Sequence, residues 1–288
     1  MDQMHEFLEI KLPVPWGHVA AKTYGPQNGK KILMVHGIFD NAGSFNRLIK
    51  FLPQEYQYVC IDLPGHGLSS KFPPGIPLHF FDYVYTILLV LDALKWKTCI
   101  YIAHSFGAHL GTYFSILYPG RLEKFIALDG FLPNFVEDII KYIRTSYNLK
   151  SYTRESSRLY TEDEVLHALQ FRRQEVLKLD AAKALFTRSV TKVNDLYKYN
   201  RDVRLKCFIS PILNMEQHNE IFNKYSTKTL VITTGRHDQF HLRLPNLSDK
   251  NILTVVTVKG NHDVHNNYPE RVAPYICTFL NNNLQSKL

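Results

Sequence analysis

Short apolar runs bounded by Gly, Pro or Asp recur along the chain at intervals that suit the strands of a parallel sheet. Their near-continuous apolar character is typical of strands that are covered on both faces. Two earlier runs, HEFLEIKL and HVAAKTYG, alternate more and predict an antiparallel hairpin at a sheet edge. The six predicted core strands are KILMVHG from Lys31, YQYVCIDLPG from Tyr56, TCIYIAHS from Thr98, KFIALDG from Lys124, KTLVITTG from Lys228 and ILTVVTVKG from Ile252.

Helical periodicity separates these strands. Apolar residues recur at three- and four-residue spacing between Val84 and Leu94, between Leu110 and Leu117, and between Val272 and Leu280. Alternation of strands and helices predicts a doubly wound α/β sheet with helices on both faces. Between about Pro133 and Gln217 the alternation stops and the chain becomes charged and helical in character. We therefore expect a core of residues 1–132 and 218–288, with residues 133–217 inserted as a helical cap.

Composition narrows the class of protein. A chain of 288 residues with 45% hydrophobic residues can bury one large α/β core. The net charge is +8, but the basic residues are scattered without a nucleic-acid-binding signature, so we expect no nucleic-acid partner. The four cysteines lie far apart, mostly in apolar runs, and predict reduced thiols. No apolar segment reaches the roughly 20 residues that span a bilayer.

The sequence AHSFG places Ser105 between a predicted strand and a predicted helix. This arrangement is close to the nucleophile-elbow pattern G-x-S-x-G, with Ala103 at the first position. A serine nucleophile needs a base and an acid, which follow in the chain order Ser, Asp or Glu, then His. Asp238 and His262 follow later strands in that order, so we predict the triad Ser105, Asp238 and His262. Asp129, which ends an earlier core strand, is the alternative acid.

The same chemistry needs main-chain donors for an oxyanion. The N–H groups of Phe106, after the nucleophile, and Ile38, in the loop HGIFDNAG, are the candidates. His36 is expected to make structural hydrogen bonds, and His262 is preferred to His265 as the base. The runs HDQFH and HDVH lack further partners at metal-ligand spacing, so no metal site is predicted. LPGHG lacks the longer phosphate-binding fingerprint and predicts no nucleotide site.

Several segments resemble the serine hydrolase-like proteins of the α/β-hydrolase superfamily, the Kraken-type group. They are HGIFDNAGSFNRLIKFLP, DLPGHGLSSKFPPG, AHSFGAHLGTYFSILYP, LDGFLP, RDVRLK and GNHDVHNNYPERVA. The resemblance spans nearly the whole chain and is least specific in the cap. It implies an α/β-hydrolase fold, no cofactor, hydrolysis of an ester, and a triad at the positions given above.

Two hypotheses for the function follow. The first is a serine hydrolase that cleaves a carboxylic ester or thioester through an acyl-enzyme on Ser105. The alternative is a catalytically inactive binding protein on the same fold. Phe39, Phe106 and the aromatic residues of the cap favour an apolar acyl group. A coenzyme A thioester is a further option, since Arg172, Arg173 and Arg188 could meet its phosphates.

The sequence finishes with Ser286, Lys287 and Leu288, and this tripeptide is a receptor-read peroxisomal address when it forms a free C-terminus. The preceding NNNLQ is polar and is expected to fray into solvent, where an import receptor could reach the signal. The N-terminal residues MDQMHEFLEI do not have the pattern of a signal peptide. We therefore expect a peroxisomal protein, with the cytoplasm as a further location.

Overall fold

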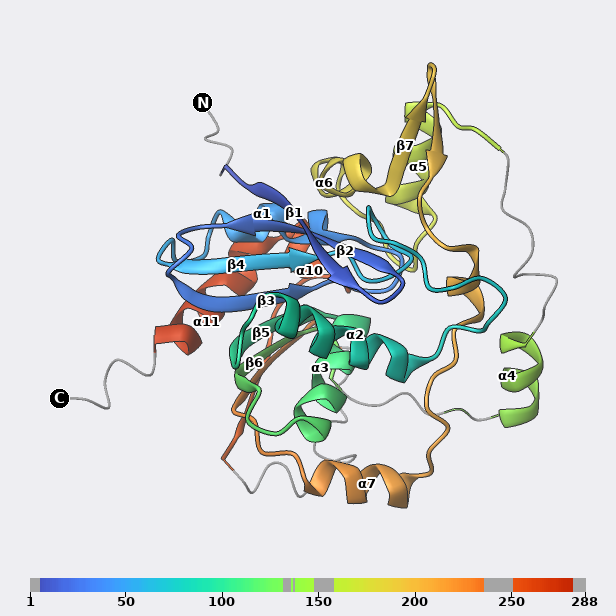
Figure 1. Cartoon of the computed structure of the whole chain (residues 1–288). Coiled ribbons are helices and arrows are strands. Elements are labelled where there is room, and N and C mark those ends of the chain that lie inside the picture. The colour runs from blue at the N-terminus through green and yellow to red at the C-terminus, as the bar shows by residue number, and fades with distance from the viewer. Residues whose placement is uncertain (1–5, 132–135, 137, 148–157, 236–250, 282–288) are drawn as a thin grey trace.

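The computed structural model describes residues 6–131, 136, 138–147, 158–235 and 251–281, and it contains an eight-stranded sheet at its centre (Figure 1). The strand order is β1-β2-β4-β3-β5-β6-β9-β10. In this sheet β1 pairs with β2 and β2 pairs with β4 in antiparallel orientation, and the other neighbouring strands are parallel. The bounds are β1 Leu8–Val14, β2 Gly17–Tyr24, β3 Lys30–Val35, β4 Tyr56–Ile61, β5 Cys99–His104, β6 Leu122–Leu128, β9 Thr229–Thr233 and β10 Leu253–Thr257. The predicted core strands and the edge hairpin are all present.

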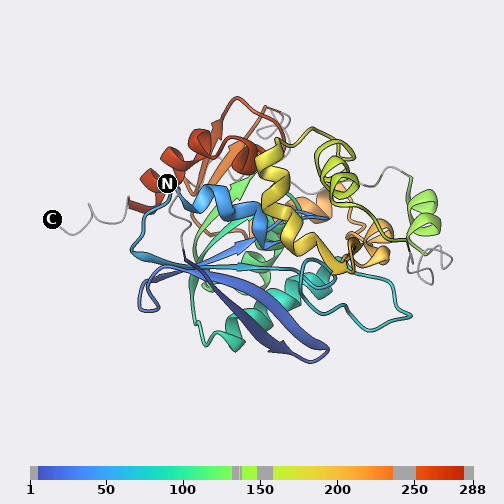
Figure 2. The same cartoon turned by 90° about the horizontal axis from the view of Figure 1, so that it is seen from above.

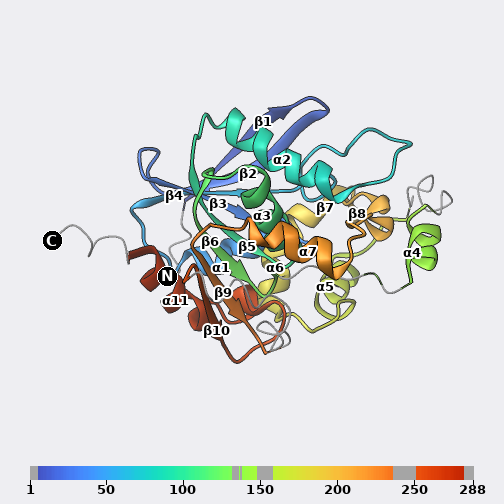
Figure 3. The same cartoon turned by 90° about the horizontal axis from the view of Figure 1, so that it is seen from below.

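Both faces of the sheet are covered by helices (Figures 2 and 3). Successive side chains of a strand point to opposite faces. In β3, Leu33 and Val35 belong to one buried cluster, whereas Ile32 and Met34 belong to the other. The continuous apolar runs of the sequence therefore fill two cores. The first core includes α2 (Phe80–Ala93) and α3 (Phe106–Leu117), and the second includes α1 (Asn46–Ile49), α10 (Val264–Asn267) and α11 (Pro269–Asn281).

We call the segment between β6 and β9 the insert. Its elements are α4 (Ile139–Ser146), α5 (Glu162–Phe171), α6 (Leu179–Ser189), β7 (Val190–Val193), β8 (Leu196–Tyr199), the 3₁₀ helix η3 (Val203–Cys207) and α7 (Met215–Asn223). Of these, α5, α6, β7 and β8 lie beyond the carboxyl ends of the parallel strands, whereas α7 packs beside α3 (Figure 1). The insert has a small core of its own that includes Val165, Leu169 and Leu185. A capping box at Thr161 and Glu164 begins one of its helices, as the sequence indicates.

The expectation of a helical cap omits the antiparallel pair β7–β8. Each strand has only four residues, which is too short to produce a readable alternation of apolar and polar positions. The helix α7 also runs through residue 217, where the sequence placed the boundary of the cap. The division into 1–132, 133–217 and 218–288 stays a prediction.

Several further expectations concern particular residues. All four cysteines are free thiols, and Cys60, Cys99 and Cys207 are buried. Within the described ranges, no helix is both long enough and apolar enough to cross a membrane. Asp238 and the tripeptide Ser286–Leu288 lie outside the described residues.

Candidate active site

Ser105 lies on a sharp turn between β5 and α3. Its φ of +48° is in the left-handed region, which costs a residue with a side chain about 1–3 kcal/mol. The main-chain N–H of Ser105 donates to the carbonyl oxygen of Leu128 in the neighbouring strand at 3.0 Å. The turn therefore fixes Ser105 at the carboxyl end of the sheet, where open α/β sheets bind their ligands.

Small residues allow the backbone to approach this turn closely. A Cβ atom on Gly107 would lie 2.4 Å from the carbonyl oxygen of Val35, and one on Gly130 would lie 2.7 Å from Cα of Ser105. The sequence predicts a small residue at position 107. In the structure, a side chain there would collide with the backbone of Val35 in β3. Gly130 was missed, although it directly follows a predicted strand in LDG. Ala103 is fully buried within β5, so the methyl group that replaces a hydrogen there fits the sheet.

Three side chains from separate strand ends form a hydrogen-bonded relay. Nε2 of His262 lies 2.8 Å from Oγ of Ser105, and Nδ1 lies 2.6 Å from Oδ2 of Asp129. When Nδ1–H donates to the carboxylate, the Nε2 lone pair is available to accept the Ser105 proton. We assign this tautomer of His262 from the hydrogen-bond partners of its two ring nitrogens. The relay has the connectivity of a nucleophile, a general base and an orienting acid.

The structure places Asp129, the alternative acid, at hydrogen-bond distance from Nδ1 of His262. A single N–H at Nδ1 donates to one acceptor, and the Asp129 carboxylate takes that place. Asp129 follows β6 directly, and β6 lies beside β5 in the sheet, so its side chain reaches the base next to the nucleophile. Asp238 lies outside the described residues.

Both carboxylate oxygens of Asp129 accept hydrogen bonds. Its side chain has no solvent exposure. Oδ1 accepts hydrogen bonds from N–H of Thr234 at 2.9 Å and from its hydroxyl at 3.0 Å. Burial alone would raise the pKa of Asp129, but the hydrogen bonds from His262 and Thr234 outweigh burial and hold it below the ordinary value. Asp129 therefore faces His262 as an anion.

The two candidate oxyanion donors belong to separate segments of the chain. Phe106 is the first residue of α3, so its N–H has no acceptor within the helix. Ile38 lines the pocket that contains Ser105. Phe39, the next residue, has a φ of +69°, so the loop turns sharply at this point. Their role as oxyanion donors stays a prediction.

Three other histidines surround the relay, and none replaces His262. Nε2 of His36 accepts from the N–H of Leu63 at 3.0 Å, and Nδ1 lies 2.7 Å from the carbonyl oxygen of Gly37, which confirms its structural role. His265, the rival base, is bonded through Nε2 to the hydroxyl of Ser44 at 2.5 Å. His104 donates from Nε2 to the carbonyl oxygen of His262 at 2.8 Å. Burial lowers the pKa of His36 to about 4 and that of His104 to about 3, so both rings are neutral.

A buried ionic cluster joins the insert to the loops that carry the relay. Arg173 donates to Asp40 at 2.7 Å and to Asp263 at 2.7 Å. Asp40 belongs to the loop of Ile38, and Asp263 follows His262. Glu175, two residues after Arg173, accepts the main-chain N–H of His262 at 2.5 Å. One short segment of the insert, which contains Arg173 and Glu175, therefore binds both the Asp40 loop and the His262 loop.

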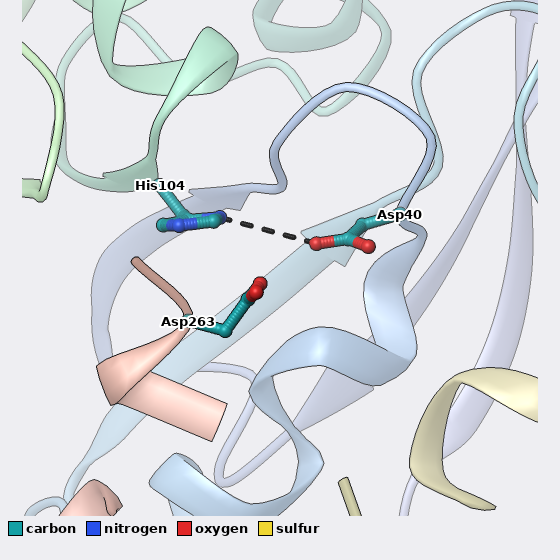
Figure 4. A group of neighbouring side chains, drawn as sticks. All are labelled: Asp40, His104 and Asp263. Atoms are coloured by element: carbon teal, nitrogen blue, oxygen red, sulfur yellow. Dashed lines mark ion pairs between the residues drawn. The ribbon is translucent and has the colours of Figure 1, made fainter. Parts of the chain in front are cut away.

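The same cluster offers three potential metal ligands. One donor atom from each of Asp40, His104 and Asp263 lies within 4.8 Å of the others (Figure 4). Nδ1 of His104 is 3.9 Å from Asp40, too far for a hydrogen bond. The guanidinium of Arg173 already binds both carboxylates, so it supplies the positive charge that a metal ion would bring. Burial raises the pKa of Asp263 to about 6, and the neighbouring Asp40 carboxylate adds to this rise while Arg173 opposes it.

Replacing Arg173 with Met is expected to destabilise the fold by about 3–5 kcal/mol, because two buried carboxylates lose their counter-charge. Urea unfolding measures this change. Adding Asp263→Asn to the Met variant should restore part of the stability, since one of the two charges disappears. Arg172→Met, at the exposed neighbouring position, is the control and should change stability little. Equal stability of the Arg173 variant and the parent would contradict the interpretation of the cluster.

A pocket of about 380 Å³ opens over Ser105 and His262. The loop after β3 contributes Ile38 and Phe39, and α5 contributes Ala168 and Leu169. Arg172, Arg173, Gln174, Glu175 and Arg201 add polar side chains from the insert. The pocket therefore combines a reactive hydroxyl, an apolar wall and a basic border, and its volume is in the range of small-molecule sites.

The chain is similar to known proteins in sequence and in fold. Residues 30–204 match the model of the alpha/beta hydrolase fold family. The chain is 34% identical to serine hydrolase-like protein 2 of Homo sapiens over 296 residues, which cover 94% of this chain and 93% of that protein. It is 32% identical to a serine hydrolase-like protein of Danio rerio, over 94% of this chain and 88% of that protein.

A solved structure shows the same fold at lower identity. A hypothetical protein from Pseudomonas aeruginosa superimposes with a TM-score of 0.82 and 22% identity over 94% of this chain and 97% of that chain. This similarity concerns the fold alone. The family model extends from the start of β3 into η3 and includes the elbow, and each of the two relatives covers 94% of the chain. The chain belongs to the α/β-hydrolase fold family and, within it, to the serine hydrolase-like proteins.

Proposed function

We propose that this protein is a serine hydrolase that cleaves a carboxylic ester or thioester through an acyl-enzyme on Ser105. The observation that carries the proposal is the relay from Ser105 through His262 to Asp129, with separations of 2.8 and 2.6 Å. The relay is already within hydrogen-bond reach, so no rearrangement of these three side chains is needed before attack.

The proposed reaction has two halves. Oγ of Ser105 attacks the acyl carbon while Nε2 of His262 takes the hydroxyl proton, and Asp129 stabilises the imidazolium. The N–H groups of Ile38 and Phe106 are proposed to bind the oxyanion of the tetrahedral intermediate. Its collapse breaks the bond to the leaving group, which takes the proton from His262. Water then attacks the acyl-serine with His262 as base, and the acid and free Ser105 are released.

The lining of the pocket supports an apolar acyl group. Ile38, from the core, and Leu169, from the insert, both line the pocket with apolar side chains. Burial of an acyl chain against such surfaces stabilises the complex by about 0.8 kcal/mol per methylene group. Longer chains should therefore bind more tightly until the pocket is full.

Turnover of p-nitrophenyl esters with two to eight acyl carbons tests the function. We expect saturable hydrolysis, with a Michaelis constant that falls as the chain lengthens and then levels off. A folded protein that binds these esters but turns none over would instead support the alternative, an inactive binding protein. Circular dichroism of the same sample checks the fold.

We also propose that Ser286, Lys287 and Leu288 direct the protein to peroxisomes through the import receptor. The test is an N-terminal fluorescent fusion that leaves Leu288 at the C-terminus. We expect punctate fluorescence that coincides with a peroxisomal marker, and a diffuse cytoplasmic signal when Leu288 is deleted. Diffuse fluorescence of the undeleted fusion would count against the proposal.

A further inference from the structure

The pocket over Ser105 shares lining residues with two other pockets that carry many cations. One, the lysine pocket, has a volume of about 130 Å³ and is lined by Lys71, Lys198 and Lys206 among others. The second, the tyrosine pocket, has a volume of about 390 Å³ and is lined by Tyr160, Tyr199 and Arg172 among others. Arg201 lines all three pockets. The three pockets are therefore neighbours and together make up one surface around Arg201.

Among the described residues that line this surface, cationic side chains outnumber acidic ones. The cationic side chains of the two outer pockets are Lys71, Arg158, Arg172, Lys198, Arg201 and Lys206, and the acidic ones are Asp163, Glu164 and Asp202. Glu164 is 3.1 Å from Arg158, and Asp202 is 2.6 Å from Arg204, which lies outside these pockets. Two of the three acidic side chains are thus neutralised locally. The remaining surface would attract a ligand with several negative charges.

Two of the three arginines that the sequence suggested for phosphate binding form ion pairs with other residues of the protein. Arg173 binds Asp40 and Asp263, as described above. Arg188 is buried and donates to Asp62 at 2.8 Å, away from the pocket over Ser105. Arg173 also lines the pocket over Ser105, but of the three only Arg172 lines the tyrosine pocket as well. The attraction for an anion therefore comes mainly from the segment around β8 and η3.

Aromatic rings alternate with these cations. The guanidinium of Arg201 lies 5.0 Å from the ring centre of Tyr199 and 5.7 Å from that of Phe39. Stacking engages the face of a guanidinium, so the N–H groups in its plane can contact phosphate oxygens. Tyr160 lies edge-on to Tyr199 at 5.1 Å. Rings and cations in this mixture suit a nucleotide, whose base stacks and whose phosphates pair with charge.

We propose, resting on the proposed function, that the substrate is an acyl thioester whose thiol carries nucleotide phosphates, as in coenzyme A. The acyl carbon lies at Ser105 and the apolar chain lies against Ile38 and Leu169. The phosphates lie at Lys198, Arg201 and Lys206, which are exposed, so a polyanion keeps much of its hydration there. Attack by Oγ breaks the C–S bond, the thiolate takes the proton from His262, and water releases the carboxylic acid.

A matched pair of thioesters tests this assignment: octanoyl-coenzyme A and octanoyl-pantetheine, which share the acyl group and the pantetheine arm and differ in the phosphorylated nucleotide. We expect kcat/KM to be at least about tenfold higher for the coenzyme A thioester at low salt. The preference should shrink at 0.5 M salt, because screening weakens the attraction of phosphates to exposed cations. A preference near one at low salt would overturn the proposal.

Substitutions locate the effect. The double variant Lys198→Ala/Lys206→Ala should reduce the preference at least about fivefold, because two charges near the phosphates are lost. Lys97→Ala is the matched control, since Lys97 is an exposed lysine in a different hollow, and should leave the preference as in the parent. An unchanged preference in the double variant would contradict the assignment of the phosphates.

A second measurement does not depend on thioester turnover. Free coenzyme A should inhibit hydrolysis of a neutral p-nitrophenyl ester competitively, and pantetheine, which lacks the phosphates, should inhibit at least about tenfold more weakly. Equal inhibition by both would refute the phosphate subsite while the hydrolase function stands. Absence of any ester or thioester hydrolysis would refute the proposed function itself, and with it this extension.

Discussion

Asp129→Asn is expected to lower kcat for an activated ester by about 10³–10⁴-fold. Thr234 donates two hydrogen bonds to Oδ1 of Asp129, so the Asn carbonyl oxygen should keep that side. Its NH₂ would then face His262 and donate to Nδ1. This arrangement holds the proton on Nε2, where the ring can no longer take the proton of Ser105. Steady-state kinetics of the purified variant measure the loss.

Asp238→Asn is the matched control for that prediction. It removes the same charge from the acid that the sequence favoured, and we expect kcat within about threefold of the parent. Large loss in the Asp238 variant together with retained activity in the Asp129 variant would reverse the assignment. Thermal unfolding of both variants separates a catalytic effect from a loss of stability.

Ser105→Ala is expected to reduce ester turnover by about 10⁴-fold or more, because the acyl-enzyme can no longer form. The substitution keeps Cβ, so the turn at φ +48° carries the same strain and the fold should remain intact. Ser115→Ala is the control on the same helix, since its hydroxyl donates to the carbonyl oxygen of Thr112 at 2.8 Å. Turnover by the Ser105 variant within tenfold of the parent would contradict a serine nucleophile.

The choice between Asp129 and Asp238 shows where reasoning from the sequence ends. Both follow predicted strands, and those strands, β6 and β9, are neighbours in the sheet. Either acid could then approach His262. The distinction depends on where the side chain points after the strand and on its partners. Asp129 accepts hydrogen bonds from Thr233 and Thr234, which lie more than 100 residues further along the chain.

The nucleophile and the base could be predicted because local constraints mark them. The elbow needs small residues close to Ser105, and His262 follows the last strand in the required chain order. No comparable local sequence pattern predicts the ionic cluster around Arg173. Its partner Asp40 is 133 residues away, and charged residues in helical segments usually face solvent. The strands were predictable for a similar reason, since burial on both faces leaves a continuous apolar run.

The central claim is that Ser105 is an activated nucleophile, and covalent labelling tests it most directly. The protein is treated with a fluorophosphonate probe and digested with trypsin, which should release the peptide Thr98–Arg121. This peptide contains two serines, Ser105 and Ser115, which tandem mass spectrometry distinguishes. We predict stoichiometric modification of Ser105 that is lost in the Ser105→Ala variant and slowed in Asp129→Asn. A folded protein with no labelled Ser105, or with the label on another residue, would contradict the claim.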